Sequence, residues 1–518
     1  MAQETELKLV FPPSAQSQVL AHPLIARSKR LGQIQMLVNT YYDTPDLALG
    51  QKKVALRTRK AGKQMLQTVK CAAESVGGLS SRPEWEQNFS GEFDFSAVAD
   101  EPRRLLEQHR EAIVPLFSTD FHRETFVLEP AEGVRILAMV DRGTIKAAGR
   151  EEDICELELE IEHGEPCHLW ALAIELAQDL PVVPFDPSKA ARGYQLFRDE
   201  PVRPVRAQPS CIHAQQSPVQ AFKALGFQIL QAWQANTWGA LNLDAPDYVH
   251  QMRVSLRRLR TLVRVFAKAL PAQFVSEWTE VLTRLANGMG VARDMDVLLA
   301  SVVAPVVADS PDDDALLALQ VCCDQARQGA KRVAREQMRQ SNCGAPLLKF
   351  AQELNGLADV GAGQSLVIFA HACLRRLRKR LRVRLAQAVA DPGPVALHKL
   401  RIGFKRMRYA LEFFAPLMVQ KTVVEYLKQL SSLQDDLGHL NDLEVAQVYF
   451  HAWGDKQPAL REAGGFVRGW HAPQAAALRQ AVLERSARLL EARAPWRKLD
   501  KSIHKGSQSV AAPHHGDS

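Results

Sequence analysis

The sequence has few cysteines and no long apolar run, and both shortages exclude whole classes of protein. Eight cysteines are scattered over 518 residues, with one adjacent pair, Cys322 and Cys323, and no Cys-x-x-Cys. This usage favours free thiols in a reducing cytoplasm over a disulfide or zinc framework. No stretch approaches the roughly 20 apolar residues of a membrane-spanning helix, and no basic region precedes an apolar one at the N-terminus. We therefore expect a cytoplasmic protein with no membrane partner and no secretory signal.

The length and the distribution of charge predict at least two domains with different partners. A chain of 518 residues is too long for one core, and its 46% apolar and 24% charged residues are typical of globular proteins. Residues 1–200 contain 23 Lys and Arg against 31 Asp and Glu, a net charge of −8. Residues 201–518 contain 42 against 27, a net charge of +15, so this part is expected to attract a polyanion.

Charged and apolar residues alternate in the strands predicted for the first 200 residues. Strand patterns cover residues 1–10, 34–43, 54–59, 66–70, 82–86, 134–141 and 154–162, and residues 13–25 have helical spacing. Period-2 spacing gives one charged face, made of Glu4, Glu6, Lys8, Arg57, Arg59, Lys70, Arg82, Glu84, Glu86, Arg123, Glu156, Glu158 and Glu160. An open antiparallel sheet with a solvated polar face explains part of this charge. Charge of both signs at nearly every second position favours a closed barrel with a charged lumen.

Such a lumen suits the chemistry of condensed phosphates. Lysine and arginine side chains on its walls would hold a phosphate chain, and clustered carboxylates would hold Mg²⁺ or Mn²⁺ through oxygen ligands. A metal in this position bridges phosphate oxygens and activates a water, as phosphoryl transfer needs.

Six charged motifs follow one another along this part of the chain. They are Glu4-x-Glu6-x-Lys8, Leu56-Arg57-Thr58-Arg59, Thr68-Val69-Lys70, Arg82-x-Glu84-x-Glu86, Asp141-x-Gly143 and Glu156-x-Glu158-x-Glu160. In this order they resemble the CYTH superfamily, the triphosphate tunnel metalloenzymes. The resemblance covers about residues 1–200 and implies an eight-stranded antiparallel β tunnel with flanking helices. It also implies action on a triphosphate, since family members are inorganic triphosphatases, thiamine triphosphatases and class IV adenylate cyclases.

The resemblance implies a site residue by residue. The implied metal ligands are Glu4, Glu6, Asp141, Glu156 and Glu158. The implied phosphate-binding cations are Lys8, Arg57, Arg59, Lys70, Arg123 and Lys189. Lys8 and Lys70 are also the implied catalytic residues, assisting the water that attacks the terminal phosphorus. Glu160 continues the acidic face but ranks lower, because it could equally lie at the rim.

A proline-rich stretch separates this part from a helical one. Three prolines in residues 200–209 and no apolar periodicity predict a linker at 201–214. Residues 215–500 have helical periodicity and no strand signal, so we expect them to be all-α. The polar residues 501–518 are expected to be disordered.

The helical part contains an internal repeat with a constant offset of 148 residues. His250-x-x-Arg253-x-x-x-Arg257-Arg258-x-Arg260 aligns with His398-x-x-Arg401-x-x-x-Lys405-Arg406-x-Arg408. Each segment places its cations on nearly one helical stripe. In one interpretation Asp294, Asp296, Asp442 and Glu444 neutralise the stripes; in the other, the stripes face one groove that binds a polyanion. No nucleic-acid recognition motif or aromatic platform accompanies them, so we expect a phosphate ligand and not nucleic acid.

These histidines and the arginines that follow them resemble the CHAD family, a helical domain of two repeated bundles often fused behind CYTH. The resemblance covers about residues 215–500, with repeats at about 215–350 and 363–500. It implies binding of inorganic polyphosphate by His250, Arg253, Arg257, Arg260, His398, Arg401, Lys405 and Arg408. The second repeat has Asn441 where the first has Arg293, so the repeats need not contribute equally.

The sequence therefore predicts an α+β multidomain protein that hydrolyses inorganic triphosphate to diphosphate and phosphate with Mg²⁺ or Mn²⁺ and binds polyphosphate through its helical part. Three alternatives stay open at this point: hydrolysis of thiamine or nucleoside triphosphates, cyclic AMP synthesis, and a non-catalytic polyphosphate-binding scaffold. A cyclase must also bind adenine and ribose, and the sequence shows no identifiable pocket for them.

Overall fold

The computed structural model describes residues 2–71, 75–243, 245–340, 343–359 and 363–499. Contacts divide the chain into two compact units: residues 1–206, 230–252 and 338–356 form the first, and the remaining residues form the second. No helix in the described ranges combines the length and the apolar content needed to cross a membrane. The domain boundaries predicted at 200, 214 and 500 stay predictions, and the tail predicted at 501–518 lies outside the described residues.

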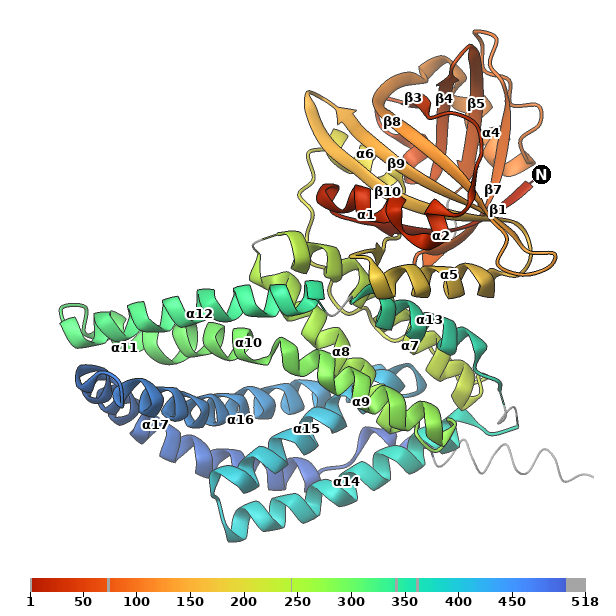
Figure 1. The fold of residues 1–518 in the computed structure, drawn as a ribbon. Coiled ribbons are helices and arrows are strands. Elements are labelled where there is room, and N and C mark those ends of the chain that lie inside the picture. The colour runs from red at the N-terminus through yellow and green to blue at the C-terminus, as the bar shows by residue number, and fades with distance from the viewer. Residues whose placement is uncertain (1, 72–74, 244, 341–342, 360–362, 500–518) are drawn as a thin grey trace, which may run out of the picture. The chain divides into compact units, whose positions relative to one another are not determined.

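Eight antiparallel strands close into a barrel in the first unit (Figure 1). They are β1 (Ala2–Val10), β3 (Gln35–Asp43), β4 (Val54–Ala61), β5 (Gln64–Cys71), β7 (Leu79–Asn88), β8 (Val114–Leu128), β9 (Arg135–Ala147) and β10 (Arg150–His163). They run around the barrel as β1-β10-β9-β8-β3-β4-β5-β7, and β7 pairs with β1 to close the ring. Three two-residue strands extend this sheet: β2 (Lys29–Arg30), β6 (Ser75–Val76) and β11 (Val183–Pro184). The predicted eight-stranded antiparallel barrel is confirmed.

Over residues 6–9 of β1, the register between β1 and β10 places charged residues opposite charged residues and leucines opposite leucines. Glu6 faces Glu160 and Lys8 faces Glu158 across this pair, with Leu7 opposite Leu159 between them. The leucines are completely buried, and α5 (Pro166–Asp179) packs against both strands from outside the barrel. An apolar layer therefore surrounds the barrel at β1 and β10, which leaves the alternate, charged side chains for the lumen.

The other helices of this part are short. They are α1 (Gln16–Ala21), α2 (Pro23–Ala26), α3 (Ala48–Gln51), α4 (Asp100–His109) and α6 (Lys189–Phe197). The helix predicted at 13–25 is divided, because His22 is extended and Pro23 begins a new turn. The hydroxyl of Ser188 accepts from Ala191 N at 3.1 Å and caps α6, so the helix begins at Lys189.

The chain beyond residue 214 is helical in the described ranges, as predicted. Its helices are α7 (Pro218–Asn242), α8 (Pro246–Phe266), α9 (Ala272–Gly288), α10 (Gly290–Val297), α11 (Ala304–Asp309), α12 (Asp314–Gln340), α13 (Gly344–Gly356), α14 (Leu366–Ala390), α15 (Pro394–Phe414), α16 (Gln420–Gly454) and α17 (Pro458–Glu491). Both ends of α7 and α14, and both ends of α8 and α15, lie 148 residues apart. A π-helical stretch, Leu298–Val303, joins α10 to α11 where α16 of the second repeat runs on unbroken.

Candidate active site and basic cluster

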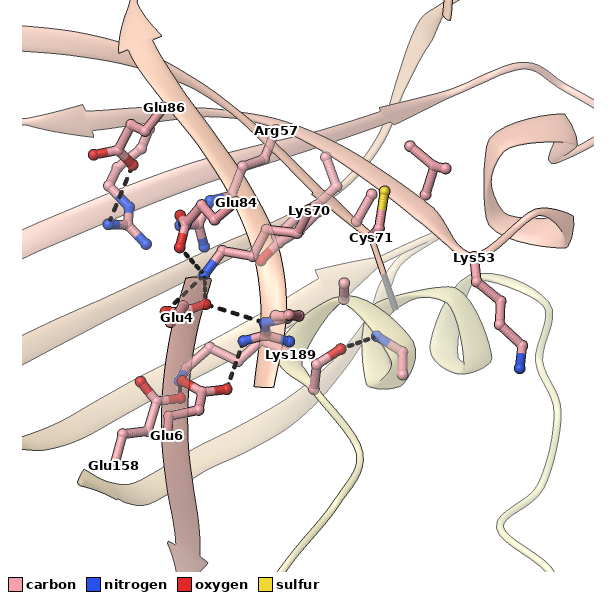
Figure 2. Close-up of a pocket in the computed structure, with 18 of the residues that line it drawn as sticks. Glu4, Glu6, Lys53, Arg57, Lys70, Cys71, Glu84, Glu86, Glu158 and Lys189 are labelled. Carbon is pink, nitrogen blue, oxygen red and sulfur yellow. Dashed lines mark hydrogen bonds and ion pairs between the residues drawn. The ribbon is translucent and has the colours of Figure 1, made fainter. Parts of the chain in front are cut away.

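The lumen of the barrel contains a cavity of about 970 Å³ that charged side chains line. Figure 2 shows carboxylates and cations from several strands pointing toward one another around it. The charged residues that line it include Glu4, Glu6, Lys8, Arg57, Arg59, Lys70, Arg82, Glu84, Glu86, Arg123, Glu158, Glu160 and Lys189. The charged faces inferred from period-2 spacing therefore converge on one cavity instead of spreading over a solvated surface.

Two carboxylates of β1 are held by cations from neighbouring strands. Lys70 Nζ donates to both oxygens of Glu4 at 2.8 and 3.0 Å. Arg82 donates from Nε to Glu4 at 3.1 Å and from Nη2 to Glu6 at 2.5 Å. Burial alone would raise the pKa of Glu4, but Lys70 and Arg82 lower it to about 2. Burial and the nearby Glu158 raise the pKa of Glu6, so its negative charge is poorly compensated and would gain from another cation.

Lys189 joins three carboxylates of β9 and β10. Its Nζ lies 2.8 Å from Asp141, 2.6 Å from Glu156 and 2.8 Å from Glu158. One oxygen from each of these carboxylates lies within 4.8 Å of the others, close enough for the three to share a metal ion. Asp141 and Glu156 are fully buried and lie behind the cavity wall, whereas Glu158 lines it.

Two arginines complete the neutralisation of this acidic group. Arg123 lies 2.6 Å from Asp141 and 2.7 Å from Glu158. Arg192, which does not line the cavity, lies 2.6 Å from Glu156. Burial alone would lower the pKa of Arg123, but the two carboxylates raise it. Asp141 and Glu156 thus hold the cations in place, and Glu158 is the member of the group that an ion in the cavity can reach.

The guanidinium groups of β4 are only loosely paired. Arg57 lies 3.8 Å from Glu84, and Arg59 lies 3.9 Å from Glu86. Arg57 Nε is buried without a hydrogen-bond partner among the described residues. Burial and the neighbouring Arg57 lower the pKa of Arg59 to about 10. Both groups therefore keep N–H donors that an anion in the cavity could accept from.

Lys8 connects the first strand to the start of α6. Its Nζ donates to the carbonyl of Pro187, which directly precedes the capping residue Ser188. The side chain is 4% exposed, and burial lowers the pKa of its ammonium group. Lys8 thus lies on the cavity wall and fixes the loop from which Lys189 enters the site.

Cations of α8 and α15 crowd together in the second unit. We call Arg253, Arg257, Arg401 and Lys405 the basic cluster. Burial and then Arg401 and Arg257 lower the pKa of Lys405 to about 7. The Nε atoms of Arg257 and Arg401 are buried without a hydrogen-bond partner among the described residues. The cluster is therefore short of negative charge, as expected for a site that accepts an anion.

Two of the four acidic residues considered as internal partners lie at this cluster. Asp294 interacts with Arg253, Arg401 and Asp442, and burial raises its pKa. Asp296 instead pairs with Lys331 of α12 at 3.3 Å. Carboxylates of the helical part therefore neutralise the basic cluster only in part, because Asp296 pairs with a cation outside it.

The other residues predicted to bind polyphosphate are not members of the basic cluster. Arg408 lies 2.8 Å from Glu412, and Arg260 lies near Arg264 and Arg257. His398 Nδ1 lies 2.6 Å from Asn441 Oδ1, so its Nε2 stays available to a ligand. His250 belongs to the part of α8 that groups with the first unit.

Family models match both parts of the chain. A CYTH-domain model matches residues 2–194, and a CHAD-domain model matches residues 226–451. The chain contains a CYTH domain followed by a CHAD domain. The resemblances stated from the motifs are thereby confirmed for both parts.

Known relatives match the two domains separately or together. An inorganic triphosphatase of Haemophilus influenzae is 34% identical over 200 residues, which cover 38% of this chain and 55% of that protein. An uncharacterised protein of Mycobacterium tuberculosis is 26% identical over 406 residues, 72% of this chain and 75% of that one. The crystal structure of a CHAD domain from Ricinus communis is 31% identical and covers 57% of this chain and 98% of that one, with a TM-score of 0.48.

The CYTH cavity contains charged residues outside the set predicted for it. Arg82, Glu84 and Glu86 of β7 line it; the sequence placed them on the charged face and in one of the six motifs, but not among the predicted ligands. Glu160 also lines it, and burial followed by Glu4 raises its pKa to about 7. Arg192 could have been found from its spacing, since it lies one helical turn after Lys189.

The donor set fits a hard divalent cation. Glu4, Glu6 and Glu158 present carboxylate oxygens to the cavity, which are the ligands that Mg²⁺ and Mn²⁺ prefer. Asp141 and Glu156, also predicted as ligands, do not line the cavity and pair with Lys189, but their oxygens lie within 4.8 Å of one of Glu158. Glu158 belongs both to the cavity wall and to the close group that it forms with Asp141 and Glu156, so it connects the five predicted ligands.

Proposed function

We propose that the CYTH domain hydrolyses inorganic triphosphate to diphosphate and phosphate with Mg²⁺ or Mn²⁺, and that the CHAD domain binds inorganic polyphosphate. The observation that carries the first part is the cavity in which cations and carboxylates from six strands and α6 converge. The 34% identity to a protein named inorganic triphosphatase, confined to 200 residues, supports the same reaction.

A linear triphosphate would replace the carboxylates as the hydrogen-bond partner of the cavity cations. Arg57, Arg59, Lys70, Arg123 and Lys189 now form ion pairs inside the cavity or just behind it. Phosphate oxygens would take over donors of these cations, because charge-assisted hydrogen bonds to phosphate are among the strongest in proteins. The carboxylates would then lose their counter-charge, which favours binding of a divalent cation in the same step. Substrate and metal are thus expected to bind cooperatively.

Glu4, Glu6 and Glu158 would hold the metal. When bound, Mg²⁺ or Mn²⁺ supplies charge neutralisation at the phosphate oxygens and lowers the pKa of a bound water. Asp141 would keep Lys189 and Arg123 aimed at the substrate, since it pairs with both, and Glu156 would do so for Lys189.

Lys8 and Lys70 are the residues proposed to assist the chemical step. The oxygen of a water bonds to the terminal phosphorus, the P–O bond to the bridging oxygen breaks, and diphosphate leaves with the electron pair. The proton that the water loses passes to a phosphate oxygen or to solvent. Lys70 contacts Glu4 of β1, and Lys8 lies four residues after Glu4 on the same strand; all three line the cavity. An ammonium group in either position would orient the water or stabilise the charge that develops on the leaving oxygen.

The purified full chain is expected to release phosphate from inorganic triphosphate faster than from ATP or thiamine triphosphate. The reason is that a short linear anion can engage all the cavity cations without placing an organic group there. Phosphate release is measured with Mg²⁺ and with Mn²⁺, then after removal of metal by EDTA, where the rate should fall to background. The cavity volume of about 970 Å³ would also admit the larger substrates, so the order of rates decides between them. No release from any of the three, with polyphosphate still retained on a filter, would favour the scaffold.

The polyphosphate part of the proposal rests on the basic cluster. A chain of phosphates would supply the negative charge that Arg253, Arg257, Arg401 and Lys405 lack. His398 would donate from Nε2 only as an imidazolium, because Asn441 Oδ1 accepts the Nδ1 proton and Nε2 of the neutral ring is an acceptor. Tyr409, whose ring lies against Arg257, is only 8% exposed and offers little surface for base stacking, so the cluster suits a phosphate polymer better than nucleic acid.

Polyphosphate binding is expected to weaken as the pH rises above about 7. Lys405 is partly neutral in the free protein, because burial and its neighbouring arginines lower its pKa to about 7. A bound polyanion favours the charged ammonium, so the pKa is higher in the complex and binding takes up a proton. Between the two pKa values the affinity should fall by up to about tenfold per pH unit. Titrations by fluorescence anisotropy between pH 6 and pH 9 measure this slope.

Lys405→Arg provides the control for this titration. Its guanidinium stays charged across the range, so the variant should lose the part of the slope that Lys405 causes. Ionisation of the polyphosphate ends affects both proteins equally and cancels in the comparison. Identical slopes for the two proteins would show that Lys405 is not the titrating group.

A further inference from the structure

The offset of 148 residues continues into the last helix of each CHAD repeat. Buried residues of α12 and α17 occur at matching positions: Leu316 and Gly464, Leu319 and Val467, Cys323 and His471, Ala334 and Val482. The two helices therefore bury the same face, and residues at equal positions of the repeats can be compared directly.

A charged network covers the first repeat beside α12. Asp296 lies 3.3 Å from Lys331 and 3.8 Å from Arg327. Arg327 also lies 2.6 Å from Asp324, which accepts from Gln328 at 2.7 Å. Two carboxylates and two cations thus neutralise one another, and their side chains fill the space between α10 and α12.

The second repeat lacks most of this network. In place of Asp324, Arg327 and Gln328 it has Ala472, Ala475 and Ala476. A cavity of about 190 Å³ opens at these alanines between α16, α17 and the π-helical stretch. The deleted side chains include an ion pair, so the space that they leave is suited to charge of both signs.

Two charges of the network remain at this cavity. Glu444 and Arg479 stand at the positions of Asp296 and Lys331, and both line the cavity. Within the described residues, neither side chain forms an ion pair. Arg479 Nε is buried without a hydrogen-bond partner in the same part of the chain. Both side chains are partly exposed, so water solvates them in the free protein, and a ligand that carries charge of both signs can replace this water.

His471 lines the cavity, but neither of its ring nitrogens is open to it. The residue is 3% exposed, and its Nε2 lies 2.9 Å from the carbonyl oxygen of Val302. A carbonyl only accepts, so Nε2 carries the proton and Nδ1 of the neutral ring is an acceptor. Nδ1 is buried and has no hydrogen-bond partner among the described residues. The remaining wall is apolar, with Leu443, Phe450 and Val467.

We propose that this cavity binds a small zwitterion of the free α-amino acid class. Its ammonium group contacts Glu444, as the guanidinium of Arg327 contacts Asp296 in the first repeat. Its carboxylate contacts Arg479 and takes the place of the Asp324 carboxylate. A cavity of about 190 Å³ has the volume of about six waters, which suits a short aliphatic side chain against the apolar wall. This site needs neither triphosphate hydrolysis nor polyphosphate.

Isothermal titration calorimetry of the full chain tests the proposal with glycine, alanine, valine and leucine. Two analogues of valine separate its charges: isobutylamine lacks the carboxylate, and isovalerate lacks the ammonium group. At least one amino acid should bind at millimolar concentration or below, and valine should bind at least tenfold more tightly than either analogue. Absence of binding by all four amino acids, or equal binding by isovalerate, overturns the proposal.

Variants place the ligand in the cavity. Glu444→Gln should weaken amino-acid binding at least tenfold, and Ala475→Arg should abolish it by restoring the side chain of the first repeat. The first repeat shows that this position of the fold accommodates arginine, and thermal unfolding checks that each variant is folded. Asp296→Asn removes the matching carboxylate of the first repeat and should leave the affinity unchanged. Unchanged affinity in both cavity variants would refute the assignment.

Discussion

Glu6→Gln is expected to lower the rate of triphosphate hydrolysis about a thousandfold. Glu6 lines the cavity, is only 5% exposed and shares Arg82 with Glu4. Glutamine keeps the shape of the side chain but removes the negative charge that would bind the metal. Loss of about 4 kcal/mol of the stabilisation that a metal provides in the transition state corresponds to this factor. Initial rates of phosphate release at saturating Mg²⁺ or Mn²⁺ measure it.

The same substitution separates the two domains. Polyphosphate binding by Glu6→Gln should stay within about twofold of the original, because charges in the barrel lumen do not belong to the basic cluster. Glu151→Gln, at an exposed position of β10, makes the same chemical change outside the lumen and should leave the rate unaltered. A Glu6→Gln rate within a few fold of the unsubstituted protein would exclude the proposed metal site.

The barrel could be predicted from the sequence because charge alternates so regularly in its strands. Residues 54–59 and 154–162 lie within or along β4 and β10, as expected from period-2 spacing. In β8, which runs from Val114 to Leu128, the charge pattern identifies only Arg123. Its polar residues at Ser118, Asp120 and His122 obscure the apolar alternation. A strand whose outer face is also polar thus gives a weak signal.

The partners of the charged residues could not be predicted. Spacing places Arg82 on the charged face of its strand, but its contacts with Glu4 and Glu6 depend on β7 pairing with β1 across more than 70 residues. The same limit applies to Asp141: the sequence predicts it as a metal ligand, but not that it is fully buried and paired with Lys189 and Arg123. Period-2 spacing defines a face, whereas depth along the lumen depends on barrel closure.

The repeat was predicted in outline and differs in detail. Both ends of α8 and α15 lie 148 residues apart, so the basic stripes on these helices can be matched from the sequence alone. The sequence did not show which acidic residue pairs with which cation: Asp296 pairs with Lys331 of α12, whereas Asp294 lies beside Arg253. These two residues lie two positions apart on one helix and therefore point in different directions.

Arg253→Ala combined with Arg401→Ala is expected to weaken polyphosphate binding about a hundredfold. Both guanidinium groups are half-buried in the basic cluster, where burial lowers the pKa of each and the nearby Asp294 and Asp442 offset part of the charge. A hydrogen bond to a charged group contributes about 1.5 kcal/mol, and two of them correspond to this factor. Fluorescence anisotropy at several salt concentrations measures the affinity, and the slope of its logarithm against the logarithm of salt should fall by about two.

A second double variant distinguishes the cluster from general attraction between a basic domain and a polyanion. Arg461→Ala combined with Arg488→Ala removes the same net charge from exposed positions of α17, where the arginines pair with Asp455 and Glu484. Exposed charges are screened by salt, so this control should weaken binding by no more than about twofold. Triphosphate hydrolysis should be unchanged in both variants. If the two double variants weaken polyphosphate binding equally, attraction is spread over the domain surface and the cluster is not the binding site.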